Sequence, residues 1–146
     1  MNVKIKKINE HALLPHYASL GASGADVFAC LKEDFLILKP HSHTFVPTGI
    51  AIELENSNYT ALLFARSGLS CKHGINLSNG VGVIDSDYRG EILVSLYNST
   101  NEIYTLKNKQ RIAQLLFIQI EKAIFLQSET LCESQRNTNG FGSTGE

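Results

Sequence analysis

Short runs of β-branched, aromatic and aliphatic residues, separated by clusters of turn-forming residues, constrain the fold of this chain more than any other feature. Such runs lie at 44–54, 59–65, 91–98 and 114–120. Turn clusters at 56–58 (NSN) and 98–101 (NSTN) separate them. Runs of this length broken by Pro, Gly and Asn are typical of a β-sandwich or β-barrel. No segment has the apolar period of an amphipathic helix of several turns, and at most one short helix is expected after 66–69. The sequence therefore predicts an all-β domain.

The size and charge of the chain narrow its class. A length of 146 residues suits one domain that can bury a core without covalent staples. The net charge is −1, so the chain lacks the basic excess of proteins that bind long nucleic acid, although a small phosphorylated ligand needs only a few cations. Residues 1–8 alternate polar and apolar side chains, and we expect a first strand with a solvated lysine face. They hold no apolar run long enough for a signal peptide or membrane span, and we expect no membrane partner.

The cysteines indicate a reducing compartment. Cys30, Cys71 and Cys132 are odd in number and widely spaced, which is a poor disulfide framework. Three free thiols and a cytoplasmic location are expected. The isolated Cys71-Lys72-His73 lacks the second pair that a zinc site needs.

The character of the chain changes near its C-terminus, and we expect a domain at 1–127 followed by a mobile arm at 128–146. Most polar C-termini are simply frayed. Phe141, however, is costly to leave in water. The flanking glycines Gly140 and Gly142, followed by Ser143 and Thr144, are typical of a loop whose backbone approaches a phosphate.

The arginines are segregated from the nine lysines. Each of the four, Arg66, Arg89, Arg111 and Arg136, lies in a short polar or glycine-containing cluster. Since Arg suits bidentate contacts with phosphate or carboxylate, these clusters indicate phosphate binding or buried ion pairs, and solvated surface arginines are the alternative.

Two glycine-containing segments have less specific patterns. Asp26, just after Gly24, is by itself typical of a turn aspartate. The Gly- and Asn-rich segment 74–85 predicts a hairpin, whose exposed backbone could also bind the edge of a flat base.

Together these clusters resemble, in order, the five motifs of the trimeric dUTPase family. The matching segments are 22–27 (ASGADV), 65–69 (ARSGL), 79–90 (NGVGVIDSDYRG), 111–115 (RIAQL), and Arg136 with 140–145 (GFGSTG). The resemblance runs from about residue 20 to the end of the chain. Ala65 replaces the usual proline before Arg66, and 108–110 (NKQ) replaces the usual turn before Arg111. Neither departure removes a reactive group, although proline would have held the backbone before Ser67 more rigidly.

The resemblance implies a fold, an assembly and a reaction. The fold would be a jelly-roll-like β-barrel that forms homotrimers, with active sites shared between subunits and closed by the C-terminal arm. The reaction would be hydrolysis of dUTP to dUMP and pyrophosphate by attack of water on the α-phosphate. It would remove dUTP and supply dUMP for thymidylate synthesis.

The resemblance also implies residue roles. Asp85 would activate the water, and Mg²⁺ would bridge the phosphates while Asp26 holds it through water. The residues expected to contact phosphates are Arg66, Ser67, Gln114, Arg136, Ser143 and Thr144. Asn79 and backbone groups would bind the uracil edge, and Phe141 would stack on the base. Tyr88 would pack under the deoxyribose and leave no room for a 2′-hydroxyl. The matching motifs also put Gly68, Val83 and Gly142 among the substrate-binding residues. Arg89, Arg111 and Asp87 would form ion pairs that hold subunits or loops together.

Two alternatives stay open. A dCTP deaminase has a related fold but uses a glutamate base, whereas the segment 84–90 matches the dUTPase pattern. A non-catalytic nucleotide-binding or regulatory protein could use the same scaffold. Such a protein would be expected to lack catalytic groups, yet this chain retains Asp26, Ser67, Asp85, Gln114, Arg136 and Phe141.

Overall fold

The computed structural model describes residues 1–135, 137 and 138, and within them the chain is almost entirely β-structure. The strands are β1 (Val3–Lys7), β2 (His16–Tyr17), β3 (Ala25–Phe28), β4 (Phe35–Leu38), β5 (His43–Pro47), β6 (Ile50–Leu54), β7 (Tyr59–Ala65), β8 (Ile75–Leu77), β9 (Gly82–Ile84), β10 (Leu93–Asn98), β11 (Tyr104–Lys107) and β12 (Arg111–Gln119). The helix α1 (Ser67–His73) follows Arg66 directly. Both the all-β class and the single short helix are as the sequence predicted.

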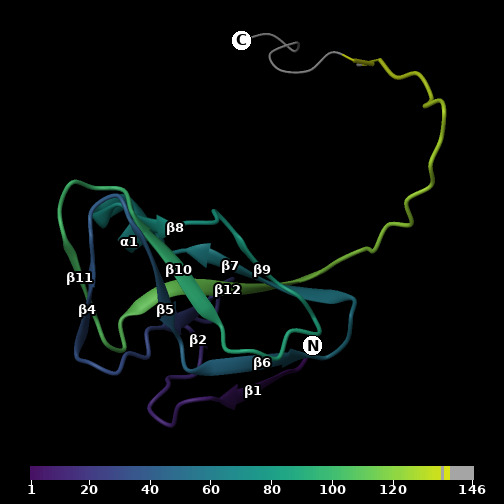
Figure 1. Cartoon of the computed structure of the whole chain (residues 1–146). Coiled ribbons are helices and arrows are strands. Elements are labelled where there is room, and N and C mark those ends of the chain that lie inside the picture. Colours follow the sequence, from purple (N-terminus) through teal and green to yellow (C-terminus); the bar gives the residue numbers. More distant parts are fainter. Residues whose placement is uncertain (136, 139–146) are drawn as a thin grey trace.

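The strands form four antiparallel sheets around one core, giving a jelly-roll-like barrel (Figure 1). The largest sheet has the order β2-β3-β12-β7-β9, and a second has the order β5-β10-β8. The pairs β1-β6 and β11-β4 complete the barrel. Strand β12 is central to the largest sheet because it pairs with both β3 and β7. Asp26 on β3 thereby lies next to Arg66, which is 40 residues later in the sequence, and next to Arg111, which is 85 residues later.

The core is aliphatic and follows the two-residue period of the strands. On β10 the side chains of Val94 and Leu96 are buried, whereas that of Leu93 points outward. On β7 the buried aliphatic side chains are those of Ala61 and Leu63, and the neighbouring Thr60 is buried as well. Burial of such side chains is the main force that holds the barrel together.

The predicted run at 44–54 forms two strands that belong to different sheets. β5 pairs with β10, and β6 pairs with β1. The chain turns between them at Gly49, which has φ +68° and has no room for a side chain, because a Cβ atom would lie 2.7 Å from Ala12 Cβ and 2.9 Å from Cys30 Sγ. Thr48 fixes this corner by donating its hydroxyl to the Ile92 carbonyl at 2.6 Å.

The prediction of a hairpin at 74–85 is wrong. β8 pairs with β10, and β9 pairs with β7, so the two strands lie in different sheets. The Asn79–Gly80 turn connects the sheets, and Gly80 supplies the positive φ of +71° that the turn needs. The partner of each strand is decided by tertiary packing, which the turn residues do not predict.

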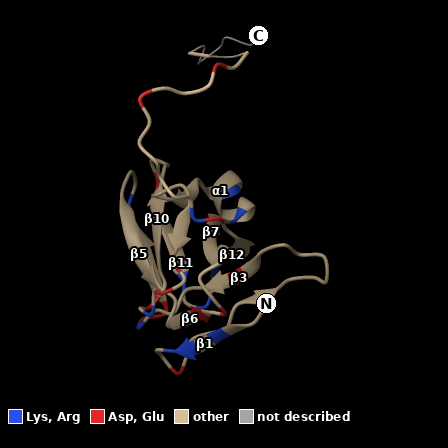
Figure 2. Ribbon diagram, turned by 90° about the vertical axis from the view of Figure 1, so that its right-hand side faces the viewer, with Lys and Arg blue, Asp and Glu red and all other residues tan. Residues whose placement is uncertain are grey.

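The N-terminal strand is as predicted, with its lysines on the surface along one edge of the molecule (Figure 2). Lys4 pairs with Glu53 at 2.9 Å across the β1–β6 ladder, and this contact lowers the pKa of the Glu53 carboxyl.

At the other end, the last backbone hydrogen bond to the barrel joins Ile120 N–H to the Asn58 carbonyl. Residues 121–135 are all exposed and lead away from the barrel (Figures 1 and 2). Within the residues described, no helix is long and apolar enough to cross a membrane.

Candidate active site

A buried carboxylate joins three of the sequence clusters. Asp26 on β3 has a side chain only 8% exposed, and it accepts a hydrogen bond from Arg66 Nε at 2.7 Å. Arg111, the first residue of β12, donates from Nη1 to the other Asp26 oxygen at 3.2 Å. Two guanidinium groups therefore share one carboxylate, which leaves this cluster with a net positive charge.

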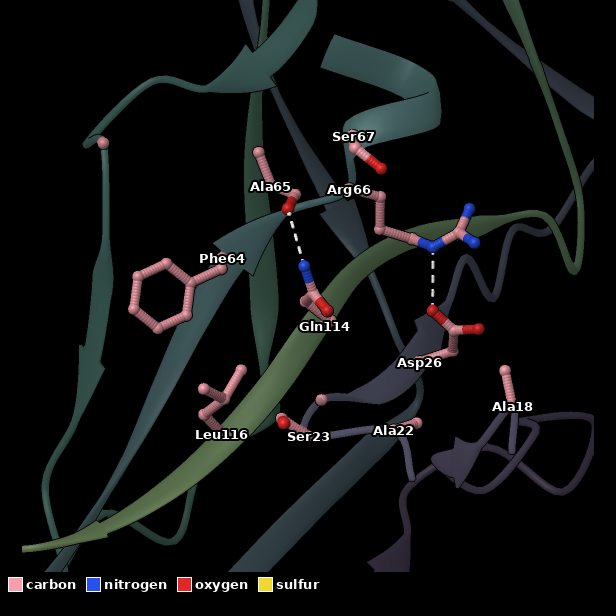
Figure 3. A pocket seen from close by; sticks show the side chains of 12 residues that line it. Ala18, Ala22, Ser23, Asp26, Phe64, Ala65, Arg66, Ser67, Gln114 and Leu116 are labelled. Carbon is pink, nitrogen blue, oxygen red and sulfur yellow. Dashed lines mark hydrogen bonds and ion pairs between the residues drawn. The ribbon is translucent and has the colours of Figure 1, made fainter. Parts of the chain in front are cut away.

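Asp26 and Arg66 of this cluster line a cavity of about 630 Å³, which we call the cationic pocket (Figure 3). Arg66 and Ser67 lie where β7 passes into α1, and Gln114 comes from β12. Gln114 donates to the Ala65 carbonyl at 3.1 Å, which orients its amide beside the start of the helix. Gly24 lines the same pocket, where a Cβ atom would lie 3.1 Å from Gln114 Cδ, so glycine permits this close packing.

The start of α1 favours an anion. In the first turn of α1, Leu69 N–H donates to the Arg66 carbonyl at 3.0 Å, whereas the N–H groups of Ser67 and Gly68 have no acceptor within the helix. Here no side chain caps them, and no acidic residue lies in the first turn. Together with Arg66 and the exposed hydroxyl-bearing Ser67, they give the cationic pocket the chemistry that binds phosphate oxygens.

A second cavity of about 260 Å³ lies beside the loop 85–91, and we call it the loop pocket. Asn79, Val83, Asp85 and Tyr88 all line it. Asp85 is exposed and follows the end of β9, while Tyr88 is 46% exposed. The pocket thus combines an accessible carboxylate, an amide and an aromatic ring, which are groups that can contact a sugar and a base.

The loop 85–91 is held by its own hydrogen bonds. Tyr88 N–H donates to the Asp85 carbonyl at 3.1 Å, which closes a turn. Arg89 Nη1 donates to the carbonyls of Ser86 and Tyr88 at 2.8 and 3.0 Å. Among the described residues of one chain, Arg89 and Asp87 take part in no ion pair. An ion pair of either residue with another subunit stays a prediction. Arg111, in contrast, forms the ion pair with Asp26.

The two pockets share no lining residue. The structure brings Asp26, Arg66, Ser67 and Gln114 together, with Gly68 directly after Ser67 in α1, and it gathers Asn79, Val83, Asp85 and Tyr88 in the other pocket. Arg136, Phe141, Gly142, Ser143 and Thr144 lie outside the described residues.

The sequence did not single out several pocket residues. Phe45, Glu91 and Leu93 line the loop pocket, and Phe45 and Leu93 are 63% and 50% exposed. Phe45 could have been found from the sequence. It stands next to the buried Val46 in an alternating strand, so its aromatic ring is expected on the surface.

The described residues hold no group of three His, Cys, Asp or Glu side chains that could coordinate a metal ion. Asp26 is a single carboxylate already shared by two arginines. This arrangement does not form a protein cage for a cation. It fits Mg²⁺ that retains its waters and is bound mainly by substrate phosphates.

Outside both pockets, burial raises the pKa of the Cys30 thiol, and the charge of Glu91 acts in the same direction. The buried Cys30 and the exposed Cys71 and Cys132 are all free thiols, as predicted.

An antiparallel barrel with a cationic pocket at a strand–helix junction and a separate carboxylate-containing loop pocket defines a jelly-roll protein equipped for a small phosphorylated ligand. The chain belongs to the dUTPase family, whose model matches residues 10–145.

Curated relatives match nearly the whole chain. A deoxyuridine 5'-triphosphate nucleotidohydrolase of Neisseria gonorrhoeae (strain NCCP11945) is 46% identical over 99% of this chain and 97% of its own. The protein with the same name from Desulfitobacterium hafniense (strain DCB-2) is 48% identical over 90% of this chain and 87% of its own.

Solved structures share the fold. The dUTPase of Staphylococcus bacteriophage 80alpha, solved with dUPNHPP, has a TM-score of 0.89 at 25% identity and covers 99% of both chains. A dUTPase from phage phi11 of S. aureus has a TM-score of 0.80 at 20% identity, covering 90% of this chain and 99% of its own, and its structure concerns a structural Mg(II) ion.

Proposed function

We infer that this chain hydrolyses dUTP to dUMP and pyrophosphate by attack of a water on the α-phosphorus. Membership of the dUTPase family and the nearly full-length likeness to named nucleotidohydrolases support this activity. In the structure, the observation that carries the proposal is the pairing of a cationic pocket with an exposed carboxylate in a neighbouring loop pocket. Phosphate hydrolysis needs both positive charge on the phosphates and a positioned water.

In the proposed binding mode, the triphosphate lies in the cationic pocket. Asp26 accepts from Arg66 Nε, so the two terminal nitrogens of that guanidinium face the phosphate oxygens. Ser67, Gly68 and Gln114 add hydroxyl, backbone and amide donors. These donors compensate the charge that develops on the phosphate oxygens as the bond to pyrophosphate breaks.

In the proposed mechanism, Asp85 is the general base. Its carboxylate orients the attacking water and accepts its proton as the oxygen bonds to the α-phosphorus. Exposure of Asp85 on the pocket wall supports this role, since a base must reach the water that it deprotonates.

The nucleoside would occupy the loop pocket. Asn79 and the backbone near Val83 would bind the uracil edge, and the ring of Tyr88 would pack against the deoxyribose. Phe141 and Gly142 would cover the base, while Arg136, Ser143 and Thr144 would contact the γ-phosphate.

Mg²⁺ is proposed as the cofactor, and it would neutralise the phosphate charge when bound. Asp26 would hold it through water.

A homotrimer with shared sites is proposed for the assembly. It is supported by the two pockets sharing no lining residue, because dUTP must contact both sets of residues and a second copy can bring its loop pocket to this chain's cationic pocket. The exposed side chains of Phe45, Val83 and Leu93 provide apolar surface around the loop pocket for such a contact.

The arm 128–146 is proposed to close the site. A cytoplasmic location is proposed on the strength of the three free thiols.

One turnover assay tests the function. Purified protein with dUTP and Mg²⁺ should release pyrophosphate and dUMP, and the same protein with dCTP should release no ammonia. Ammonia release from dCTP would instead identify a deaminase. Binding of dUTP without turnover would favour the non-catalytic alternative.

A further inference from the structure

The ring of Tyr88 lies directly against the backbone of Gly90 at the wall of the loop pocket. A Cβ atom added at Gly90 would lie 2.6 Å from Tyr88 Cζ and 3.1 Å from Tyr88 Cε2. Both distances are shorter than ordinary van der Waals contact, so a side chain at position 90 would compete with the ring for the same space. The missing side chain of Gly90 therefore permits the present position of the ring.

The hydroxyl group of Tyr88 is held as well. It donates to the Glu91 carbonyl at 2.9 Å, so the ring is fixed at its far end while Gly90 lies beneath it. Because this bond occupies the hydroxyl proton, the exposed surface that Tyr88 offers to a ligand is its ring rather than its O–H donor.

Glu91, whose carbonyl accepts the hydrogen bond from the Tyr88 hydroxyl, is itself anchored to the barrel. The Glu91 carboxylate accepts from Gly49 N–H at 2.7 Å, and Ile92 N–H donates to the Ile50 carbonyl at 2.9 Å. These bonds tie the end of the loop to the corner between β5 and β6. Backbone that is fixed in this way gives the ring a defined height above Gly90.

We propose that Gly90 is a positioning residue for sugar discrimination, and that it acts only through Tyr88. Its lack of a side chain sets how far the Tyr88 ring projects into the loop pocket, and this determines the space left for a 2′-hydroxyl. The inference depends on the proposed dUTP hydrolysis.

Alanine at position 90 is an informative change because the backbone tolerates it. Gly90 lacks the positive φ found at Gly49, Gly74 and Gly80, so an L-residue fits its conformation. The three atoms nearest to such a Cβ atom all belong to the end of the half-exposed Tyr88 side chain, which can rotate away. At Gly49, in contrast, the clash is with buried groups beneath a positive φ. Gly90→Ala should therefore move the Tyr88 ring without unfolding the protein.

The experiment compares kcat/KM for dUTP and for UTP in the parent, Gly90→Ala, Tyr88→Ala and the double variant. Gly21→Ala is the matched control, because a Cβ atom at Gly21 has no neighbour within 4 Å and its φ is not positive. The dUTP/UTP ratio should fall about tenfold or more in Gly90→Ala, the scale of a one-carbon misfit in a binding pocket. In the Tyr88→Ala background, Gly90→Ala should change the ratio less than about twofold, since the ring through which it acts is gone.

Three results would overturn the inference. The first is an unchanged dUTP/UTP ratio in Gly90→Ala. The second is an equal effect of Gly90→Ala on that ratio with and without the Tyr88 ring. The third is a melting temperature lowered by more than about 5 °C in Gly90→Ala alone, beyond the usual effect of a surface change. An inactive parent protein would refute the proposed function as well, whereas an active parent with an unchanged ratio would refute only the role of Gly90.

Discussion

Replacing Asp26 by Asn should both destabilise the protein and weaken phosphate binding. The change keeps the size of the side chain but removes the charge that two arginines share. The Asp26 side chain is 8% exposed, that of Arg66 is 25% exposed and that of Arg111 is 47% exposed. Removing one partner of a fully buried pair costs about 3–5 kcal/mol. Water can solvate the half-exposed Arg111, so we expect a smaller loss of about 2–3 kcal/mol.

For a chain of this size, that loss corresponds to a decrease of roughly 4–12 °C in melting temperature. The measurement is thermal unfolding at one fixed protein concentration, since assembly makes the midpoint concentration-dependent. Glu53→Gln is the matched control. It makes the same chemical change in the exposed Lys4–Glu53 pair, where no measurable shift is expected.

The same variant should raise the KM for dUTP, because Arg66 loses the carboxylate that orients its guanidinium toward the cationic pocket. If Asp26→Asn melted within about 1 °C of the parent, the shared carboxylate would not stabilise the fold as argued. An unchanged KM would show that Arg66 needs no orientation by Asp26.

Three further predictions concern other parts of the molecule. Asp85→Asn should lower kcat by about 10²–10⁴-fold with little change in dUTP binding, and turnover near the parent rate would exclude Asp85 as the base. Alkylation of the native protein at mildly alkaline pH, read by mass spectrometry, should modify the exposed Cys71 and Cys132 before Cys30, because burial raises the pKa of the Cys30 thiol and shields it; equal rates for all three would contradict this. Deleting residues 136–146 should leave the melting temperature nearly unchanged, since among the described residues the last backbone hydrogen bond to the barrel is made by Ile120, yet reduce turnover severely; full activity in the truncated protein would refute the proposed closure of the site.

The pairing of Asp26 with two arginines also bears on how the cationic pocket works. Without substrate, the carboxylate keeps the guanidiniums from repelling one another. Arg66 is thus oriented before a phosphate arrives. Such preorganisation lowers the cost of binding a highly charged ligand, and it explains why an acidic residue lies within a pocket suited to anions.

The sequence by itself determined the features that depend on local patterns. Alternating side chains predicted β1. The lack of a helical period limited the expected α-structure to one short helix after 66–69, and the structure forms α1 from Ser67. These features follow from backbone geometry and side-chain type over a few residues, so they are visible before any long-range contact forms. The candidates Asp26, Arg66, Ser67 and Gln114 came instead from the resemblance of the ordered motifs to those of the dUTPase family.

Only the tertiary structure decided which of these segments meet. β8 and β9 join different sheets, Arg111 reaches a carboxylate 85 residues away, and Glu91 anchors the corner at Gly49. Strand partners and such long-range contacts are chosen by how the whole core packs, and many pairings satisfy the same local pattern. The space beneath the Tyr88 ring likewise exists only once the loop 85–91 has closed on the barrel, so no local pattern could assign Gly90 its place there.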